Sequence, residues 1–267
     1  VEVDHFSFNE ADGGYQILFT PQQATAFIKQ AGARFKKAGL KTTFLLGDTS
    51  KTEGTVEYIS AIVSDPQVLP YLGPISFHAW WSEQMPDSEF ERVAMLGKKL
   101  NKEIWCGELG FDAMAWKQKG SSQNWDFALR FAKISMRMFK YSQTVVSLYW
   151  TWQNNYAIMS ADTKTKYPSY YVTKQQVNYF NRNAQLVQCV SSDPSILTIA
   201  SIQGRRIAIQ VLNEQDTEVT VSIDGIKANH VQIISTSNNN PWEEAEADTL
   251  SGLVLKPKSI SVLVLNL

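Results

Sequence analysis

Short apolar runs alternate with stretches of helical period over about the first 185 residues of the chain. The runs are too apolar for a sheet with one face in solvent, and such runs are typical of strands buried on both faces of a parallel sheet. The predicted strands are 3–8, 42–47, 74–78, 103–107 and 144–150. The predicted helices are 21–38, 55–63, 89–100, 124–141 and 170–180. This alternation predicts an α/β fold with a parallel sheet covered by helices, as in a portion of a (β/α)8 TIM barrel.

The first of these helices has clear boundary signals. Thr20 can cap it, Pro21 suits the first helical position, and Gln23 completes a capping box. Gly39 follows the last residue of the apolar face and is expected to end the helix.

The pattern changes after Asp193-Pro194, where short runs follow one another with turn residues between them and no helical period. Regular short strands of this kind predict an antiparallel β-sandwich. We therefore expect two domains, a partial barrel at 1–185 and a β-sandwich at 186–267. The predicted strands of the sandwich are 197–202, 206–212, 218–223, 231–235 and 260–265.

Polar or large aromatic residues lie at or just after the carboxyl end of every predicted strand of the first domain. Barrel enzymes keep their active sites at this carboxyl end of the strands, so these residues are candidates for one shared site. In strand order they are Asn9 and Glu10; Asp48; His78, Trp80 and Trp81; Glu108; and Trp150, Trp152 and Gln153.

Two of these residues, Glu10 and Glu108, suggest the chemistry. Glycosidic bonds are cleaved by a pair of carboxyl groups, one that protonates the leaving oxygen and one that attacks the sugar or activates water. Asn9, next to Glu10, can bond a sugar hydroxyl, and Trp150 and Trp152 can form the floor of a sugar site.

Structural roles are an alternative for each residue taken alone. Asp48 could cap the turn that follows it, His78 could be a satisfied core histidine, and Trp81 could be a surface aromatic. Either glutamate alone could be a solvated charge at a strand end.

Composition narrows the classes of partner. The 267 residues carry a formal net charge of -1, so no basic field suggests nucleic acid or an anionic membrane. No apolar run reaches the roughly 18 residues of a membrane span. Cys106 and Cys189 are far apart in sequence and are expected to be two buried thiols rather than a disulfide.

The histidines and glycines of the sequence give no metal or cofactor signal. His5, His78 and His230 lack ligand spacing with one another, and the sequence shows neither a glycine-rich phosphate loop nor a Gly-x-Ser-x-Gly motif. We therefore expect neither a metal nor a cofactor.

Several motifs resemble those of clan A glycoside hydrolases. Residues 7–10, Ser-Phe-Asn-Glu, are similar to the Asn-Glu segment after the fourth barrel strand of that clan, and residues 105–110, Trp-Cys-Gly-Glu-Leu-Gly, to its nucleophile segment after the seventh. Residues 75–80 resemble the sixth strand and 148–152 the eighth. Residues 170–175 and the β-rich tail resemble glycoside hydrolase families 30 and 39, in which a small sandwich packs on the barrel.

The resemblance implies specific roles. Glu10 would be the general acid/base and Glu108 the nucleophile of a retaining hydrolase, with Asn9 binding the hydroxyl next to the reacting carbon and His78 lining the site. Trp80 stands where many clan members have a tyrosine that bonds the nucleophile, and an indole can donate but not accept a hydrogen bond. The resemblance further implies a secreted or periplasmic protein.

The resemblance covers only strands four to eight of a barrel. A complete barrel takes about 250 residues, so we expect this chain to be a fragment whose partner is the missing N-terminal barrel half or another copy of the chain. The expected function is hydrolysis of O-glycosidic bonds in a polysaccharide or oligosaccharide. The alternative is a non-catalytic carbohydrate-binding protein on the same fold, and turnover of an aryl glycoside would distinguish the two.

Overall fold

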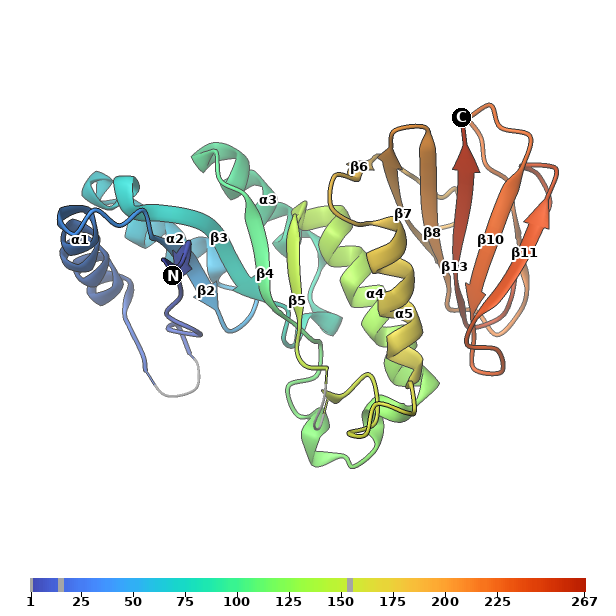
Figure 1. Cartoon of the computed structure of the whole chain (residues 1–267), viewed down its shortest axis with the longest axis horizontal. Helices are drawn as coiled ribbons and strands as arrows, with labels where there is room; N and C mark the ends of the chain where they lie inside the picture. The colour runs from blue at the N-terminus through green and yellow to red at the C-terminus, as the bar shows by residue number, and fades with distance from the viewer. Residues whose placement is uncertain (1, 14–16, 153–155) are drawn as a thin grey trace. The chain divides into compact units, whose positions relative to one another are not determined.

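The computed structural model describes residues 2–13, 17–152 and 156–267 (Figure 1). Two compact units can be distinguished, and each is treated separately below. The first comprises Val1–Ala113 and Arg137–Trp150, and the second comprises Met114–Met136 and Thr151–Leu267. The predicted boundary at residues 185 and 186 stays a prediction.

The first unit is built on a five-stranded parallel sheet with the strand order β1-β2-β3-β4-β5. Its helices alternate with the strands along the chain, as expected from the apolar pattern. The elements are β1 (His5–Phe6), α1 (Pro21–Lys37), β2 (Thr43–Thr49), α2 (Thr55–Val63), η1 (Pro66–Tyr71), β3 (Leu72–His78), η2 (Ser82–Gln84), α3 (Asp87–Leu100), β4 (Ile104–Leu109), the end of α4 (Trp125–Ser142) and β5 (Val146–Tyr149).

The ends of α1 confirm the predicted boundary signals. The Thr20 side chain accepts a hydrogen bond from the Gln23 backbone, and the Gln23 side chain bonds back to the Thr20 backbone. The core of this unit is formed by fully buried strand residues packed against the helices, among them Phe44, Ile75 and Phe77.

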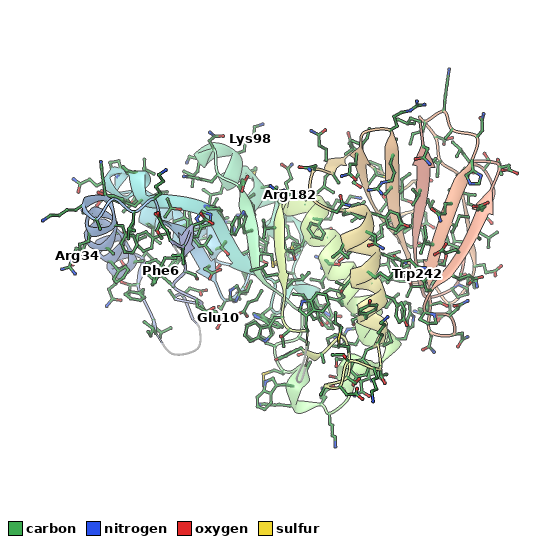
Figure 2. All side chains as sticks on the ribbon, viewed as in Figure 1. Phe6, Glu10, Arg34, Lys98, Arg182 and Trp242 are labelled. Carbon is green, nitrogen blue, oxygen red and sulfur yellow. The ribbon has the colours of Figure 1, made fainter. Side chains whose placement is uncertain are left out.

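The outer strands of the parallel sheet carry exposed apolar side chains. Val3 and Phe6 are exposed at β1, and Val145 and Leu148 at β5. Phe6, labelled in Figure 2, also packs in an aromatic cluster with Phe27 of α1 and other rings. Strand β1 pairs with β2 through His5 and Phe6 only, so it is much shorter than the run at 3–8 suggested.

The second unit contains an antiparallel six-stranded sheet, with the order β11-β10-β13-β8-β7-β6, and a two-stranded sheet of β12 and β9. It also holds helix α5 (Pro168–Tyr179), two short helices and the start of α4. Its elements are η3 (Ala115–Lys117), η4 (Ser121–Gln123), β6 (Gln185–Val187), β7 (Ile196–Gln203), β8 (Arg206–Asn213), β9 (Val219–Val221), β10 (Val231–Thr236), β11 (Glu243–Ala247), β12 (Leu253–Leu255) and β13 (Ser259–Asn266).

Both faces of the six-stranded sheet are covered. On one face Ile209, Leu263 and their neighbours pack with Leu253 and Leu255 of β12. On the other, Gln175 of α5 donates hydrogen bonds to the backbone oxygens of Ile234 and Ile260. The fold is thus a curled parallel half-barrel sheet with helices, joined in sequence to antiparallel sheets.

Candidate active site

Glu10 is positioned by a strained turn directly after β1. Asn9 and Glu10 have φ angles of 46° and 60°, in the left-handed region that residues other than glycine rarely adopt. The Glu10 backbone N–H donates a hydrogen bond of 2.8 Å to the carbonyl of Asp48, which anchors the turn to the end of β2. Strain of this kind persists only where its surroundings hold it, and it clusters at functional sites.

Asp48 is a buried carboxylate next to an irregularity in the pairing of β2 with β3. The hydroxyl of Ser7 donates to its Oδ2, and that of Ser76 donates to its Oδ1 at 2.5 Å. Burial opposes ionisation of this group, but the bond and charge of His78, with the two serine hydroxyls, outweigh burial and lower the pKa of Asp48. Gly107 leaves room for it, since a Cβ there would overlap Oδ1 of Asp48.

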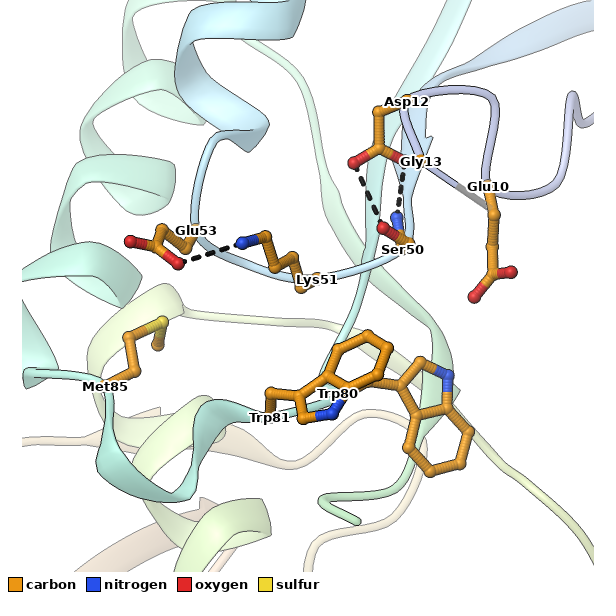
Figure 3. A pocket seen from close by; sticks show the side chains of 9 residues that line it. All are labelled: Glu10, Asp12, Gly13, Ser50, Lys51, Glu53, Trp80, Trp81 and Met85. Atoms are coloured by element: carbon orange, nitrogen blue, oxygen red, sulfur yellow. Dashed lines mark hydrogen bonds and ion pairs between the residues drawn. The ribbon is translucent and has the colours of Figure 1, made fainter. Parts of the chain in front are cut away.

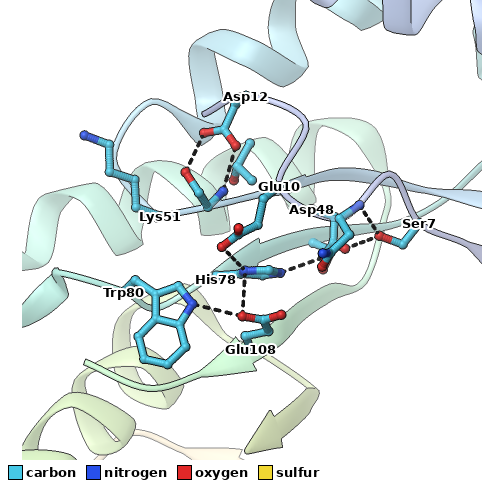
Figure 4. A network of polar contacts seen from close by, with 12 residues as sticks. Ser7, Glu10, Asp12, Asp48, Lys51, His78, Trp80 and Glu108 are labelled. Atoms are coloured by element: carbon cyan, nitrogen blue, oxygen red, sulfur yellow. Dashed lines mark hydrogen bonds and ion pairs between the residues drawn. The ribbon is translucent and has the colours of Figure 1, made fainter. Parts of the chain in front are cut away.

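His78 is the centre of the site, and only 1% of its side chain is exposed. Its Nδ1 atom lies 3.1 Å from Oε1 of Glu10 and 3.3 Å from Oε2 of Glu108. Its Nε2 atom lies 3.5 Å from Oδ1 of Asp48 (Figure 4). Burial works against a charged ring, but hydrogen bonds to the three carboxylates outweigh it and raise the pKa of His78 to about 11. The three carboxylates therefore favour the imidazolium form of His78 at neutral pH.

Glu108 is held by its neighbours on β3 and the following loop. The indole Nε1 of Trp80 donates a hydrogen bond of 3.0 Å to Oε2 of Glu108. The Ala79 backbone N–H donates to the Glu108 carbonyl at 3.0 Å, so backbone and side chain are both fixed. Gly110 makes space for the Trp80 ring, which a Cβ at position 110 would overlap.

The two glutamates face the same small space. An oxygen of Glu10 and an oxygen of Glu108 lie within 4.8 Å of each other, on either side of Nδ1 of His78. Their side chains are 17% and 13% exposed, so both are partly shielded and still reachable from solvent.

Glu10, His78 and Glu108 also place three potential metal-ligand atoms within 4.8 Å of one another. A metal would need the neutral imidazole, whereas hydrogen bonds to Asp48, Glu10 and Glu108 raise the pKa of His78 and favour the protonated ring. The same proton accounts for both close contacts of Nδ1. We therefore interpret this group as a hydrogen-bond network.

A cavity of about 620 Å³ opens beside Glu10 (Figure 3). Its walls come from the loops after β1, β2 and β3. Glu10 and Trp80 are the lining residues that belong to the site around His78. Asp12 ties two of these loops together by accepting hydrogen bonds from the backbone N–H and the hydroxyl of Ser50. Trp81 is 54% exposed and offers an aromatic face in this cavity.

The remaining predicted residues have different surroundings. Asn9 is exposed beside Glu10, and Trp150 is exposed directly after β5. Trp152 is exposed in the second unit, so its part in the site stays a prediction. Gln153 lies outside the described residues. Cys106 is buried as expected, and burial raises the pKa of its thiol, whereas Cys189 is only half-buried.

Sequence reasoning missed the supporting residues of the site. Ser7 and Ser76 hold Asp48, while Gly107 and Gly110 leave space for Asp48 and Trp80. The only available signal was their position beside the candidates, and serines and glycines next to strand ends are common in any α/β protein.

No protein-family model and no curated protein matches this sequence. Solved structures do match it, over nearly its whole length. The family 30, subfamily 8 xylanase from Clostridium acetobutylicum superposes with a TM-score of 0.80 at 16% sequence identity, covering 99% of this chain and 66% of that chain. The family 30 endoxylanase from Clostridium papyrosolvens gives 0.78 at 16% identity with the same coverage. The catalytic domain of a family 30 xylanase from Talaromyces cellulolyticus gives 0.74 at 18% identity, covering 99% and 63%.

These similarities define the class of fold. The chain has a clan A-like glycoside hydrolase fold, similar to that of family 30 xylanases. It spans slightly less than two thirds of the two clostridial enzymes, 66% of each. Another structure of similar fold is a conserved exported protein from Bacteroides fragilis, with a TM-score of 0.77 at 13% identity. No helix in the described part of the chain is long and apolar enough to cross a membrane.

Proposed function

We propose that this chain carries the catalytic carboxylates of a retaining glycoside hydrolase. The observation that supports this most directly is the separation of Glu10 and Glu108, whose nearest oxygens lie within 4.8 Å. Retaining enzymes place their two carboxyl groups about 5–5.5 Å apart, while inverting enzymes need about 6.5–9.5 Å to admit a water.

Glu10 is the general acid/base and Glu108 the nucleophile in this proposal. In the first step an oxygen of Glu108 attacks the anomeric carbon while Glu10 gives its proton to the leaving oxygen. In the second step Glu10 takes a proton from water, and the water oxygen replaces Glu108 on the sugar. The indole N–H of Trp80 holds the Glu108 carboxylate in its orientation. Asn9 is exposed and available to bond a sugar hydroxyl.

Asp48 and His78 support Glu10 and Glu108 and do not contact the sugar themselves. Both were expected to contact substrate, but both are buried and have carboxylate or hydroxyl partners of their own. We assign them a positioning role.

The cavity beside Glu10 receives the leaving group. Glu10 lines this cavity and Glu108 does not, so it extends from the side on which the departing oxygen is protonated. Trp81 offers a face on which a sugar ring can stack, while Asp12 and Lys51 contribute polar atoms to the walls. This favours a substrate with a saccharide leaving group.

Full activity needs more polypeptide around the parallel sheet. Its two outer strands expose apolar side chains, including Phe6 and Leu148, and unpaired apolar edges are usually covered. We propose that strands equivalent to the first three of a barrel cover these edges, with a second copy of the chain as the alternative. The mass in solution, measured by light scattering, distinguishes a dimer from a monomer. By analogy with the exported Bacteroides fragilis protein, we also propose a secreted or periplasmic location.

The same open edges favour a second candidate, a non-catalytic carbohydrate-binding protein. Trapping with the 2,4-dinitrophenyl glycoside of 2-deoxy-2-fluoroxylose separates the two functions, because the fluorine stabilises a glycosyl-enzyme. Mass spectrometry should find one added sugar on the peptide that contains Glu108. A sugar on the Glu10 peptide would reverse the roles. Binding of xylotetraose without any label would favour the non-catalytic function.

A further inference from the structure

One imidazole ring, that of His78, contacts three carboxylates in this site. Asp48 faces Nε2 at 3.5 Å, while Glu10 and Glu108 face Nδ1 at 3.1 and 3.3 Å. Nδ1 carries a single proton, so at any moment only one of the two glutamates can receive a short, linear hydrogen bond from it. The two distances are nearly equal, which means that little movement is needed to exchange one acceptor for the other.

We propose that His78 is a positioning residue whose Nδ1–H bonds alternately to Glu108 and to Glu10 as the negative charge moves between them. This proposal rests on the function proposed above. Before reaction Glu108 must be anionic and Glu10 protonated, so Nδ1–H bonds to Glu108. Once Glu108 is esterified to the sugar and Glu10 has given up its proton, Glu10 is the anion and Nδ1–H bonds to it.

No proton leaves His78 in this cycle. The proton that reaches the leaving oxygen comes from Glu10, and the proton that restores Glu10 comes from the attacking water. The only change at His78 is the acceptor of its hydrogen bond. The cationic ring is attracted more strongly to an anionic carboxylate than to a neutral carboxyl, so the bond follows whichever glutamate is charged and stabilises the state that each step requires.

Asp48 makes this possible by fixing the other side of the ring. It faces Nε2–H, and its own oxygens are held by Ser7 and Ser76. The ring therefore keeps both protons and cannot turn freely. The remaining titratable group close to Asp48 from β4 is the buried Cys106 thiol, whose raised pKa keeps it neutral.

The first test needs no turnover. The pKa of His78 is measured by ¹⁵N NMR in the full chain and in Glu10→Gln, Glu108→Gln and the double variant. If one proton uses either acceptor, each single change should lower the pKa of His78 by about one unit, and the double change by about three. Glu53→Gln, a charge removal at the far side of the cavity, should leave it unchanged.

Other outcomes of that test overturn the proposal. Equal and additive decreases would mean that both glutamates bond independently, and a full decrease in one single variant would mean that only that glutamate is bonded. An unmodified His78 that titrates near 6.5 would mean that the buried imidazolium does not form. If a glutamine variant fails to fold, the Nδ1–H resonance of the unmodified chain is instead compared before and after fluoro-sugar trapping, and an unchanged shift contradicts the alternation.

Kinetics separate this proposal from the proposed function itself. His78→Gln should slow both the formation and the hydrolysis of the glycosyl-enzyme, each by about 10-fold to 100-fold. A residue that orients only one glutamate would also affect both steps, because each glutamate acts in both, so the pKa comparison above separates that case. An unchanged rate of either step in His78→Gln would overturn the alternation. If the unmodified protein forms no glycosyl-enzyme while the NMR result holds, the proposed function fails and the shared hydrogen bond stands.

Discussion

The indole N–H of Trp80 donates a hydrogen bond of 3.0 Å to Oε2 of Glu108. Only 5% of Trp80 is exposed, so the bond is shielded from water and holds one oxygen of the carboxylate in place. The resemblance to clan A glycoside hydrolases implied a tyrosine hydroxyl at this position. An indole can supply the same donated bond, and it leaves the other carboxylate oxygen available for attack.

Replacing Trp80 with phenylalanine removes this donor and keeps an aromatic ring. A hydrogen bond to a charged group contributes about 1.5–3 kcal/mol, so we expect Trp80→Phe to lower kcat/KM by about 10-fold to 100-fold. Trp81→Phe is the matched control because Trp81 is exposed and keeps an aromatic face. Equal losses in the two variants would show that the bond to Glu108 has no special role.

A methyl group at position 107 should displace the Asp48 carboxylate that supports His78. A Cβ on Gly107 would overlap Oδ1 of Asp48, whose carboxylate cannot move without leaving Ser76 or His78. We expect Gly107→Ala to destabilise the protein by about 1–3 kcal/mol and to lower the pKa of His78. Gly13→Ala is the control for unfolding, since its nearest neighbour would be 3.5 Å away. An unchanged His78 pKa in Gly107→Ala would contradict the account.

Stability should depend on alkaline pH through His78. The pKa of this ring rises from 6.5 to about 11 on folding, so its contribution is complete below pH 6.5 and is lost as the pH approaches 11. Each pH unit across this window removes at most about 1.4 kcal/mol. Urea unfolding at pH 7 and pH 10 should show a larger decrease for the unmodified chain than for His78→Gln. Parallel decreases would mean that His78 is not a buried cation.

The cavity beside Glu10 predicts a selective effect of Trp81→Ala. If Trp81 stacks on a leaving-group sugar, this variant should lose about 10-fold or more in kcat/KM on an oligosaccharide substrate, since stacking on an aromatic ring contributes about 1–3 kcal/mol. The glycosyl fluoride of the same sugar has no leaving-group sugar, so its hydrolysis should be unaffected. Similar losses on both substrates would place the effect at the carboxylates and not in the cavity.

The strong apolar patterns of the chain were sufficient to predict most of the fold. Helix α2 begins and ends as predicted, and α1 has its capping box. Strand β11 was missed because Glu243–Ala247 reads Glu-Glu-Ala-Glu-Ala, the composition of a charged outer strand. Strand β1 was overestimated because only His5 and Phe6 pair with β2, and strand pairing has no direct signature in hydrophobicity.

The candidate site was only partly predictable for a related reason. Their positions in the sequence predicted that Glu10, Asp48, His78 and Glu108 lie together at the carboxyl ends of the strands. Their contacts depend on register, and the pairing of β3 with β4 shifts between Phe77 and His78. Such bulges re-aim side chains next to active sites, and they cannot be located from apolar spacing. That one imidazolium links the carboxylates therefore became visible only in three dimensions.

The assignment of Glu10 as acid/base and Glu108 as nucleophile is tested most directly by azide rescue of Glu10→Ala and Glu108→Ala with an activated aryl glycoside. Glu108→Ala should lose hydrolysis altogether, because no covalent intermediate can form. Glu10→Ala should still form the glycosyl-enzyme, since an activated phenol barely needs a proton, and should accumulate it for lack of a base. Azide should restore turnover of Glu10→Ala and yield a glycosyl azide of retained configuration. Rescue of Glu108→Ala through the retained product, with Glu10→Ala unaffected, would contradict the assignment and exchange the two roles.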